Sequence, residues 1–124
     1  MNKTVLEVQN LSKNYNNIKA VSELSLHVDE KMVYGILGPN GSGKTTTLGM
    51  LLGVVNQNQG SYSWFDNGNK DENRKRIGTL LETPNFYPYL TAEQNLEITA
   101  KIKEVDGVSS EIDRVLKMVD LYER

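Results

Sequence analysis

Hydrophobic residues in the first 90 positions recur at the spacing expected of β-strands. Those at residues 5–8 predict a first strand, and those at 21–28, which partly alternate with polar residues, predict a second. Two continuous apolar runs, 32–37 and 77–81, predict buried strands. Segment 60–65 predicts a further strand, because its aromatic side chains fit a pleated surface. This part of the chain should therefore be rich in strands.

Two helices are expected among these strands. Apolar residues recur through 46–52, and Gly53 can end that helix as a C-terminal cap. Segment 71–76 is strongly charged and predicts a short helix, which the polar stretch 66–69 should precede as a turn. Strands and helices are thus interspersed, as in an α/β fold.

From Thr91 onward the pattern becomes helical. Thr91 and Gln94 fit a capping box, in which the hydroxyl and the amide each bond a backbone N–H of the first turn. Ser109 or Ser110 is expected to cap a second helix. The apolar residues of that helix have helical spacing and predict a packing face: Ile112, Val115, Leu116 and Val119.

The glycine-rich stretch 38–45 matches the phosphate-binding pattern G-x-x-x-x-G-K-[ST] at every fixed position. Its glycines let backbone N–H groups turn inward around an anion. Lys44 adds a charge that can reach the outer phosphates, and the Thr45 hydroxyl can ligate Mg²⁺, which prefers oxygen. The helix that follows directs the positive end of its dipole at the phosphates.

The context of this stretch supports the match. A buried strand is predicted before it, at 32–37, and a helix after it, at 46–52, as a phosphate-binding loop requires. The alternative is a glycine-rich turn that carries a lysine by chance, and the two flanking elements favour the phosphate-binding interpretation.

Composition narrows the classes of function. The chain has 124 residues, enough for one domain or part of one, and a net charge of −2, which gives no electrostatic support for nucleic-acid binding. It has no cysteine for disulfides or thiolate metal sites, and its single His27 is expected on a strand surface. No apolar run reaches the roughly 18 residues of a membrane span. We therefore expect a cytoplasmic protein without direct membrane insertion.

Five stretches together resemble the N-terminal half of the nucleotide-binding subunit of ATP-binding cassette (ABC) transporters. Residues 6–15 resemble that family's first strand with its adenine-stacking aromatic, and residues 20–26 resemble its second hairpin strand. Residues 34–46 resemble its phosphate loop and residues 77–82 its glutamine loop. Residues 91–96 resemble its T-x-x-E-N-L stretch. The resemblance covers essentially the whole chain, so it is more specific than the phosphate loop alone.

The resemblance implies an α/β fold, the N-terminal half of an ABC-type P-loop NTPase domain. Residues 1–90 would form a partial ATP-binding core, with an antiparallel β subdomain, the P-loop core strands and helix, and the glutamine-loop region. Residues 91–124 would be the truncated start of the α-helical subdomain.

The same resemblance implies a site for ATP and Mg²⁺. Tyr15 would stack on adenine, Lys44 and Glu82 would be catalytic, and Thr45 and Glu82 would ligate the metal. The residues that would contact the nucleotide phosphates are Gly38, Pro39, Asn40, Gly41, Ser42, Gly43, Lys44, Thr45 and Thr46. Tyr15 could instead pack on its own hairpin as a loop tyrosine.

Glu82 departs from the commonest family pattern, which has glutamine at this position. The glutamate form resembles the branch that exports bacitracin and lantibiotic peptides. A carboxylate is a stronger ligand of Mg²⁺ than an amide, and it adds negative charge near the γ-phosphate. The alternative is a surface glutamate at the end of a strand.

Family membership would also imply partners. One partner would be the transmembrane permease subunits, which would hold the protein on the inner face of the membrane as a peripheral protein. The other would be a second nucleotide-binding subunit, which would form a dimer with this one across the bound ATP. The apolar loop 86–90 would face the permease or pack onto the following helix.

The signature, the second acidic strand (Walker B) and the late histidine (H-loop) of the family are not found after Thr91. The 124 residues are therefore expected to bind ATP but not to hydrolyse it. The alternatives are an inactive ATP-binding remnant and a non-transport P-loop protein such as a small kinase or GTPase. For a GTPase, 69–72 has glutamate where the guanine-binding motif needs aspartate.

Overall fold

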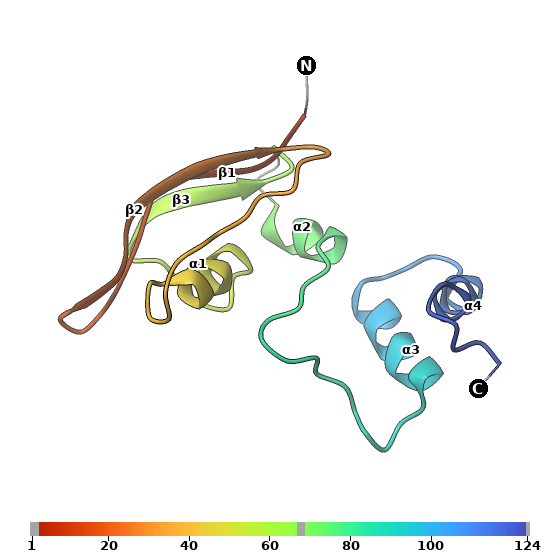
Figure 1. The fold of residues 1–124 in the computed structure, drawn as a ribbon. Helices are drawn as coiled ribbons and strands as arrows, with labels where there is room; N and C mark the ends of the chain where they lie inside the picture. The colour runs from red at the N-terminus through yellow and green to blue at the C-terminus, as the bar shows by residue number, and fades with distance from the viewer. Residues whose placement is uncertain (1–2, 67–68, 124) are drawn as a thin grey trace. The chain divides into compact units, whose positions relative to one another are not determined.

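Two units make up the structure, Met1–Arg74 and Lys75–Arg124, and each is described by itself. The computed structural model describes residues 3–66 and 69–123 (Figure 1). The turn predicted at 66–69 lies partly outside the described residues.

The first unit contains a three-stranded antiparallel sheet with the strand order β2-β1-β3. Its strands are β1 (Thr4–Tyr15), β2 (Ile18–Asp29) and β3 (Gln59–Trp64). β1 and β2 form a long hairpin, and β3 pairs with the other edge of β1. The three strands predicted at 5–8, 21–28 and 60–65 are therefore confirmed.

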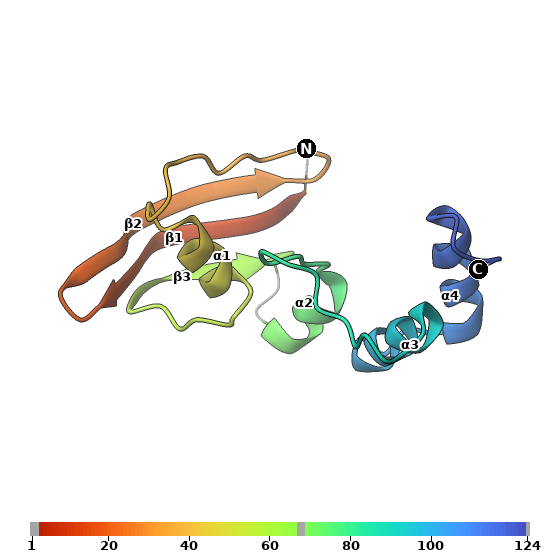
Figure 2. The ribbon, with the colours of Figure 1, turned by 60° about the horizontal axis from the view of Figure 1, so that its bottom comes forward.

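Helix α1 (Lys44–Leu51) lies against one face of this sheet (Figures 1 and 2). The core between them consists of buried apolar side chains from both elements: Leu6, Val8, Leu11, Val21, Met50 and Leu51. Full burial of one such side chain stabilises the unit by about 1.5–3 kcal/mol. The indole Nε1 of Trp64 donates to the carbonyl of Leu51 at 2.8 Å, which ties β3 to the end of the helix.

Two irregularities in the hairpin explain its hydrophobic spacing. The inward residues of β1 are Leu6, Val8 and Leu11 rather than every second residue, and the register shifts between Val8 and Leu11. In β2 the spacing from Val21 to Leu24 is also three, and the register shifts back there. Each extra residue forms a β-bulge, so Leu11 and Val21 both remain on the core side.

Two of the predicted strands are wrong. Residues 32–37 and 77–81 have no regular secondary structure, and their side chains are mostly exposed, among them Val33, Leu37 and Leu80. An apolar run forms a buried strand only where neighbouring strands pair with its backbone. Within the described residues neither run has such a neighbour, because the sheet consists of β1, β2 and β3 alone. The P-loop core strands are therefore not formed as strands.

The second unit contains α3 (Ala92–Ile102) and α4 (Val108–Met118). The predicted capping box is confirmed: Gln94 N donates to Thr91 Oγ1 at 3.1 Å, and Thr91 N donates to Gln94 Oε1 at 2.9 Å. The cap expected at Ser109 or Ser110 is wrong. The chain enters α4 through Gly107 in a left-handed conformation, a turn that favours glycine.

The charged segment 71–76 forms a short helix as predicted, α2 (Lys70–Arg76). At its end, Lys103 Nζ donates to the carbonyl of Ile77 at 2.5 Å and to that of Lys75 at 3.4 Å. A lysine at the C-terminal end of a helix complements the helix dipole. None of the helices in the described residues has the length and apolar character to cross a bilayer.

Candidate functional site

The glycine-rich loop and the first turn of α1 form the candidate site. The α-helix begins at Lys44, directly after Gly43, and Thr47 N donates to the carbonyl of Gly43 at 2.8 Å. Ser42 N donates to the carbonyl of Pro39 at 3.1 Å, which closes a turn within the loop. The first turn of α1 has no acidic residue, so the positive end of its dipole is not neutralised from within the helix.

Gly43 fixes how closely the loop approaches the sheet. Its φ is 94°, a conformation that side chains rarely adopt, and a Cβ at this position would lie 2.2 Å from the carbonyl oxygen of Ala20 in β2. The loop can therefore lie against the backbone of β2 only because residue 43 has no side chain. This contact places the start of α1 beside the end of the hairpin.

Lys44 folds back over the loop that precedes it. Its Nζ donates to the carbonyl of Gly38 at 2.6 Å and to that of Pro39 at 2.8 Å, and lies 3.4 Å from Ser42 Oγ. The ammonium is therefore held inside the curve of the loop. Charged donors bind anionic oxygens more strongly than neutral carbonyls. An anion that entered the loop could therefore take over these bonds.

Thr45 and Thr46 lie in the first turn of α1, where Thr45 is exposed and Thr46 is half-buried. The Thr45 hydroxyl is therefore accessible as a hard oxygen ligand of the kind that Mg²⁺ prefers. Within the described residues, no cluster of three or more histidine, cysteine or acidic residues is placed to hold a metal.

Tyr15 lies at the turn end of the β1–β2 hairpin. In the β1–β2 ladder Tyr15 pairs with Ile18 and Asn14 pairs with Lys19, so Ala20, which contacts Gly43, is close to the same end. The Tyr15 side chain is 46% exposed, and Lys13 Nζ lies 5.1 Å from its ring centroid. One face of the ring is therefore beside a cation, and much of the ring is accessible to a ligand.

Glu82 belongs to the second unit, whereas the other predicted site residues belong to the first. It is exposed and has a φ of 59°, which is unusual for a residue other than glycine. Its roles as a metal ligand and as a catalytic group remain predictions. His27, expected on a strand surface, lies on β2 with its Nε2 2.8 Å from Asp29 Oδ1.

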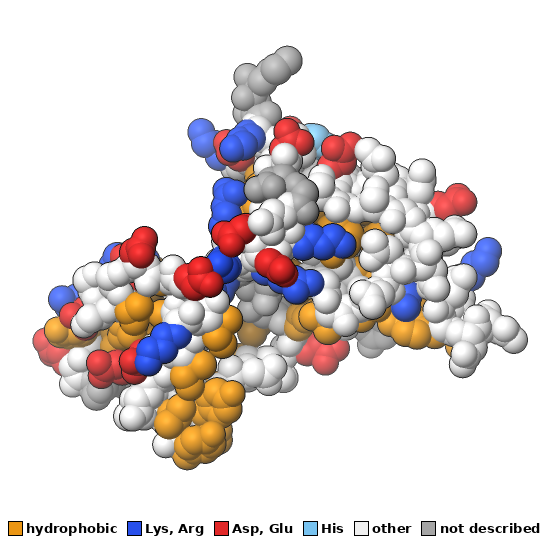
Figure 3. Space-filling view, turned by 180° about the vertical axis from the view of Figure 1, so that it is seen from behind, with side chains coloured by type: hydrophobic (Ala, Val, Ile, Leu, Met, Phe, Trp, Pro, Cys, Tyr) orange, Lys and Arg blue, Asp and Glu red, His pale blue; other side chains and the backbone are white. Residues whose placement is uncertain are grey.

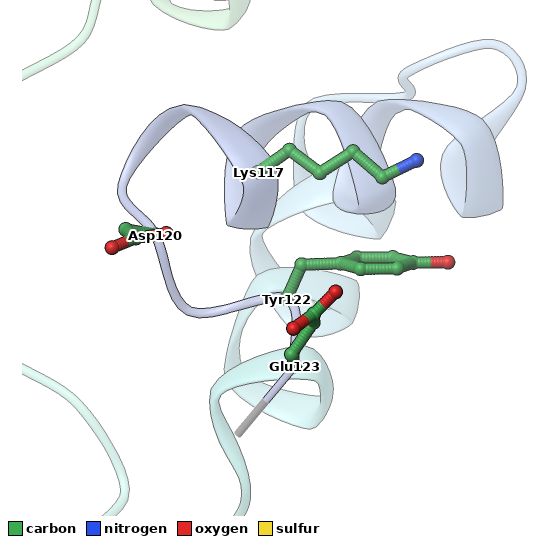
Figure 4. Close-up of a pocket in the computed structure, with 4 residues that line it drawn as sticks. All are labelled: Lys117, Asp120, Tyr122 and Glu123. Atoms are coloured by element: carbon green, nitrogen blue, oxygen red, sulfur yellow. The ribbon is translucent and has the colours of Figure 1, made fainter.

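The second unit also contains a shallow cavity of about 590 Å³ after α4. Figure 4 shows its lining residues Lys117, Asp120, Tyr122 and Glu123, and Lys117 Nζ lies 4.3 Å from the centroid of the Tyr122 ring. Two carboxylates and one lysine leave no net positive charge for a phosphate. This cavity is therefore a poor candidate for the anion site.

Sequence reasoning missed two residues that hold loops in place. The amide of Asn95 bonds both backbone groups of Tyr87 and the carbonyl of Leu90, and so holds the loop before α3. In the first unit, Asn58 Oδ1 accepts from Asn14 N at 2.7 Å. A polar residue in a loop gives no sequence signal for such bonds, because its partners are set by the fold.

Hydrophobic side chains gather on the loop between α2 and α3, as Figure 3 shows. Phe86 is 66% exposed and Tyr89 is 77% exposed, so most of the surface of both side chains is accessible within this unit. Exposed apolar patches of this kind often mark surfaces that bind partners.

The family model described as "ABC transporter" matches residues 21–124. A bacitracin transport ATP-binding protein, BcrA of Bacillus licheniformis, is 41% identical over 121 residues, which are 95% of this chain and 39% of the relative. BcrA of Enterococcus faecalis is 37% identical over 122 residues, with the same coverage of both chains. The chain therefore belongs to the ABC transporter family, and it spans about two fifths of the length of these relatives.

Solved structures agree with this assignment. An ATP-binding subunit of an ABC transporter superposes with a TM-score of 0.84 at 26% identity, over 97% of this chain and 52% of that chain. A nucleotide-free ATP-binding cassette from an ABC transporter has a TM-score of 0.63 at 22% identity and supports the fold alone. The mixed α/β fold class predicted from the sequence is confirmed.

Proposed function

We propose that this chain binds the triphosphate of MgATP in the loop 38–46, as part of an ATP-binding subunit of an ABC transporter. One observation carries the proposal: the Lys44 ammonium is held inside a glycine-rich loop that opens directly into α1. A phosphate chain in this loop would meet the lysine and the N-terminus of the helix, and the backbone N–H groups of a glycine-rich loop can turn toward such an anion.

Titration calorimetry with MgATP and with AMP tests this proposal. ATP should bind, and AMP should bind much more weakly, because it lacks the outer phosphates that Lys44 would reach. Equal affinities for the two nucleotides would contradict a site built around the phosphates.

The residues of the loop 38–46 suit the phosphates of ATP and a bound Mg²⁺. The loop would hold the phosphates and Lys44 would neutralise their charge, while the Thr45 hydroxyl would be a ligand of Mg²⁺. A role for Glu82 as a second metal ligand is a proposal that rests on the sequence alone. Bound Mg²⁺ would neutralise negative charge on the outer phosphates. Hydrolysis also needs a group that positions the attacking water, and the 124 residues contain no such family motif. We therefore propose that these residues bind ATP and that turnover requires further groups.

Removal of the Tyr15 ring tests adenine stacking. Tyr15→Ala should lower the affinity for ATP several-fold, since an aromatic contact contributes about 0.5–1.5 kcal/mol beyond area burial. Tyr15→Phe keeps the ring and should bind ATP nearly as well as the parent chain. Calorimetry on the three proteins would decide the matter, and unchanged affinity in Tyr15→Ala would favour a tyrosine that packs only on its own hairpin.

Replacement of the Glu82 carboxylate tests the metal site. Glu82→Gln should weaken the dependence of ATP binding on Mg²⁺ and leave binding of the adenine nearly unchanged, because an amide is the weaker ligand. The measurement is ATP affinity as a function of Mg²⁺ concentration, with Glu93→Gln on α3 as the matched control. Identical Mg²⁺ titrations for Glu82→Gln and the parent chain would argue against metal contact.

We further propose that ATP hydrolysis in the complete protein powers export by a partner permease, with peptide antibiotics of the bacitracin type as the substrate class. The names of the two BcrA relatives support this class, as does the glutamate at position 82. The partners would be transmembrane permease subunits, which the exposed loop 86–90 would face, and a second nucleotide-binding subunit. The protein would then be peripheral on the cytoplasmic face of the membrane.

A further inference from the structure

Two of the four register irregularities of the hairpin, those on either side of Leu11, form a matched pair. Asn10 in β1 has a φ of 49° and Glu23 in β2 has a φ of 47°, both in the left-handed region. The register shift at the first bulge is reversed at the second. A bulge bends and twists its strand, so this pair, together with the shift between Lys13 and Asn14, sets the direction in which the hairpin continues toward Tyr15.

A serine hydroxyl satisfies the backbone N–H of each bulge residue. Ser12 Oγ accepts from Glu23 N at 2.8 Å, and Ser25 Oγ accepts from Asn10 N at 2.9 Å. The two serines differ in environment, since Ser12 is 8% exposed and Ser25 is exposed. The bond of Ser25 is exposed, so water can replace that hydroxyl, whereas the bond of Ser12 to Glu23 N is partly buried and is replaced less easily.

The Ser12 bond connects the two segments that lead to the candidate site. Ser12 lies three residues before Tyr15, and Glu23 lies three residues after Ala20, whose carbonyl contacts Gly43. The carbonyl of Ser12 also accepts from Asn58 N at 2.9 Å. This hydroxyl therefore joins the two strands of the hairpin at a point three residues from Tyr15.

We propose that Ser12 is a positioning residue for the nucleotide base. It holds the hairpin end so that Tyr15 lies at the correct distance from phosphates bound in the loop 38–46. The inference rests on the proposed ATP site and adds a specificity role for a residue that does not touch the ligand. Its consequence is that Ser12 contributes to the base-dependent part of the affinity and not to the phosphate-dependent part.

Calorimetric titrations of the full chain with MgATP and with Mg-tripolyphosphate, which lacks a base, separate these two parts. Ser12→Ala should lower ATP affinity about two- to tenfold, the range set by loss of an aromatic contact, while tripolyphosphate affinity stays within about twofold. Ser12→Thr restores the hydroxyl and should recover most of the loss. Ser25→Ala removes the exposed hydroxyl and should leave both affinities unchanged.

A double-mutant cycle with Tyr15→Ala shows whether Ser12 acts through the ring. In the Tyr15→Ala background, Ser12→Ala should cause no further loss of ATP affinity, because the ring that it positions is absent. Unchanged ATP binding in Ser12→Ala, equal losses for both ligands, or additive losses in the cycle would each overturn the inference. Failure of the parent chain to bind tripolyphosphate would instead overturn the phosphate site itself.

Discussion

Lys44→Ala should lower the affinity of the chain for ATP about ten- to a hundredfold, the effect expected when a hydrogen bond to a charged group is lost. The physical reason is the position of the ammonium, which lies 2.6 Å from the carbonyl oxygen of Gly38 and 2.8 Å from that of Pro39. In this position it can meet the negative charge of the outer phosphates without rearrangement of the helix. Calorimetric titration with MgATP measures the loss.

Lys3→Ala is the matched control for charge. It removes the same charge from an exposed lysine in the same unit, and ATP affinity should change little. AMP binding gives a second control, because a nucleotide without outer phosphates should be almost insensitive to Lys44. Equal losses in Lys44→Ala and Lys3→Ala would mean that Lys44 acts only through net charge.

Gly43→Ala should destabilise the first unit and abolish the geometry of the loop. The new methyl group would meet the carbonyl oxygen of Ala20 at 2.2 Å, and residue 43 would keep a φ of 94°. Left-handed backbone alone costs an alanine about 1–2 kcal/mol, before the steric contact is counted. Loss of that size is a large share of the roughly 5–15 kcal/mol by which a domain is stable.

Urea unfolding, followed by tryptophan fluorescence, measures the stability of the first unit, which contains Gly43. Trp64 is the single tryptophan of the chain, and its indole bonds the end of α1, so its signal reports on the packing of sheet against helix. Gly35→Ala is the matched control, since a Cβ there meets nothing within 4 Å. Gly41→Ala should be intermediate, because its φ is 83° but its surroundings are open. Equal stability of the Gly43 and Gly35 variants would contradict the contact with Ala20.

The local sequence pattern correctly predicted those elements whose stabilising contacts are between residues close together in the chain. The hydrophobic positions of the β1–β2 hairpin alternate in part, and a short turn joins the two strands. The capping box at Thr91 was predictable because its two hydrogen bonds span three residues. Gly53 ends the first helix region with a φ of 71°, as a C-terminal glycine should.

The failures have a common physical origin in non-local contacts. The apolar runs 32–37 and 77–81 have strand composition, yet a buried strand needs neighbours that the described sheet does not supply. The bulges were also missed, although the three-residue spacings from Val8 to Leu11 and from Val21 to Leu24 are a signal for them. A break in strict alternation between two hydrophobic positions is the feature that would have revealed them.

Only part of the candidate site was predictable. The loop pattern located Lys44 and Gly43 correctly, because the motif is contiguous in sequence. The bonds of Ser12 and Asn58 to other segments were not predictable, since they depend on how the hairpin bends. Glu82 lies in the other unit, so its role in the site remains a prediction that the Mg²⁺ titration must test.

Backbone amide shifts, measured by NMR while MgATP is added, test the central claim most directly. If the loop binds the phosphates, the largest changes should fall on the amides of residues 41–46, with smaller changes at Tyr15 from the adenine ring. Lys44→Ala should suppress the changes in the loop. Changes centred elsewhere, such as the cavity after α4, or no changes at saturating nucleotide, would contradict a phosphate site in this loop.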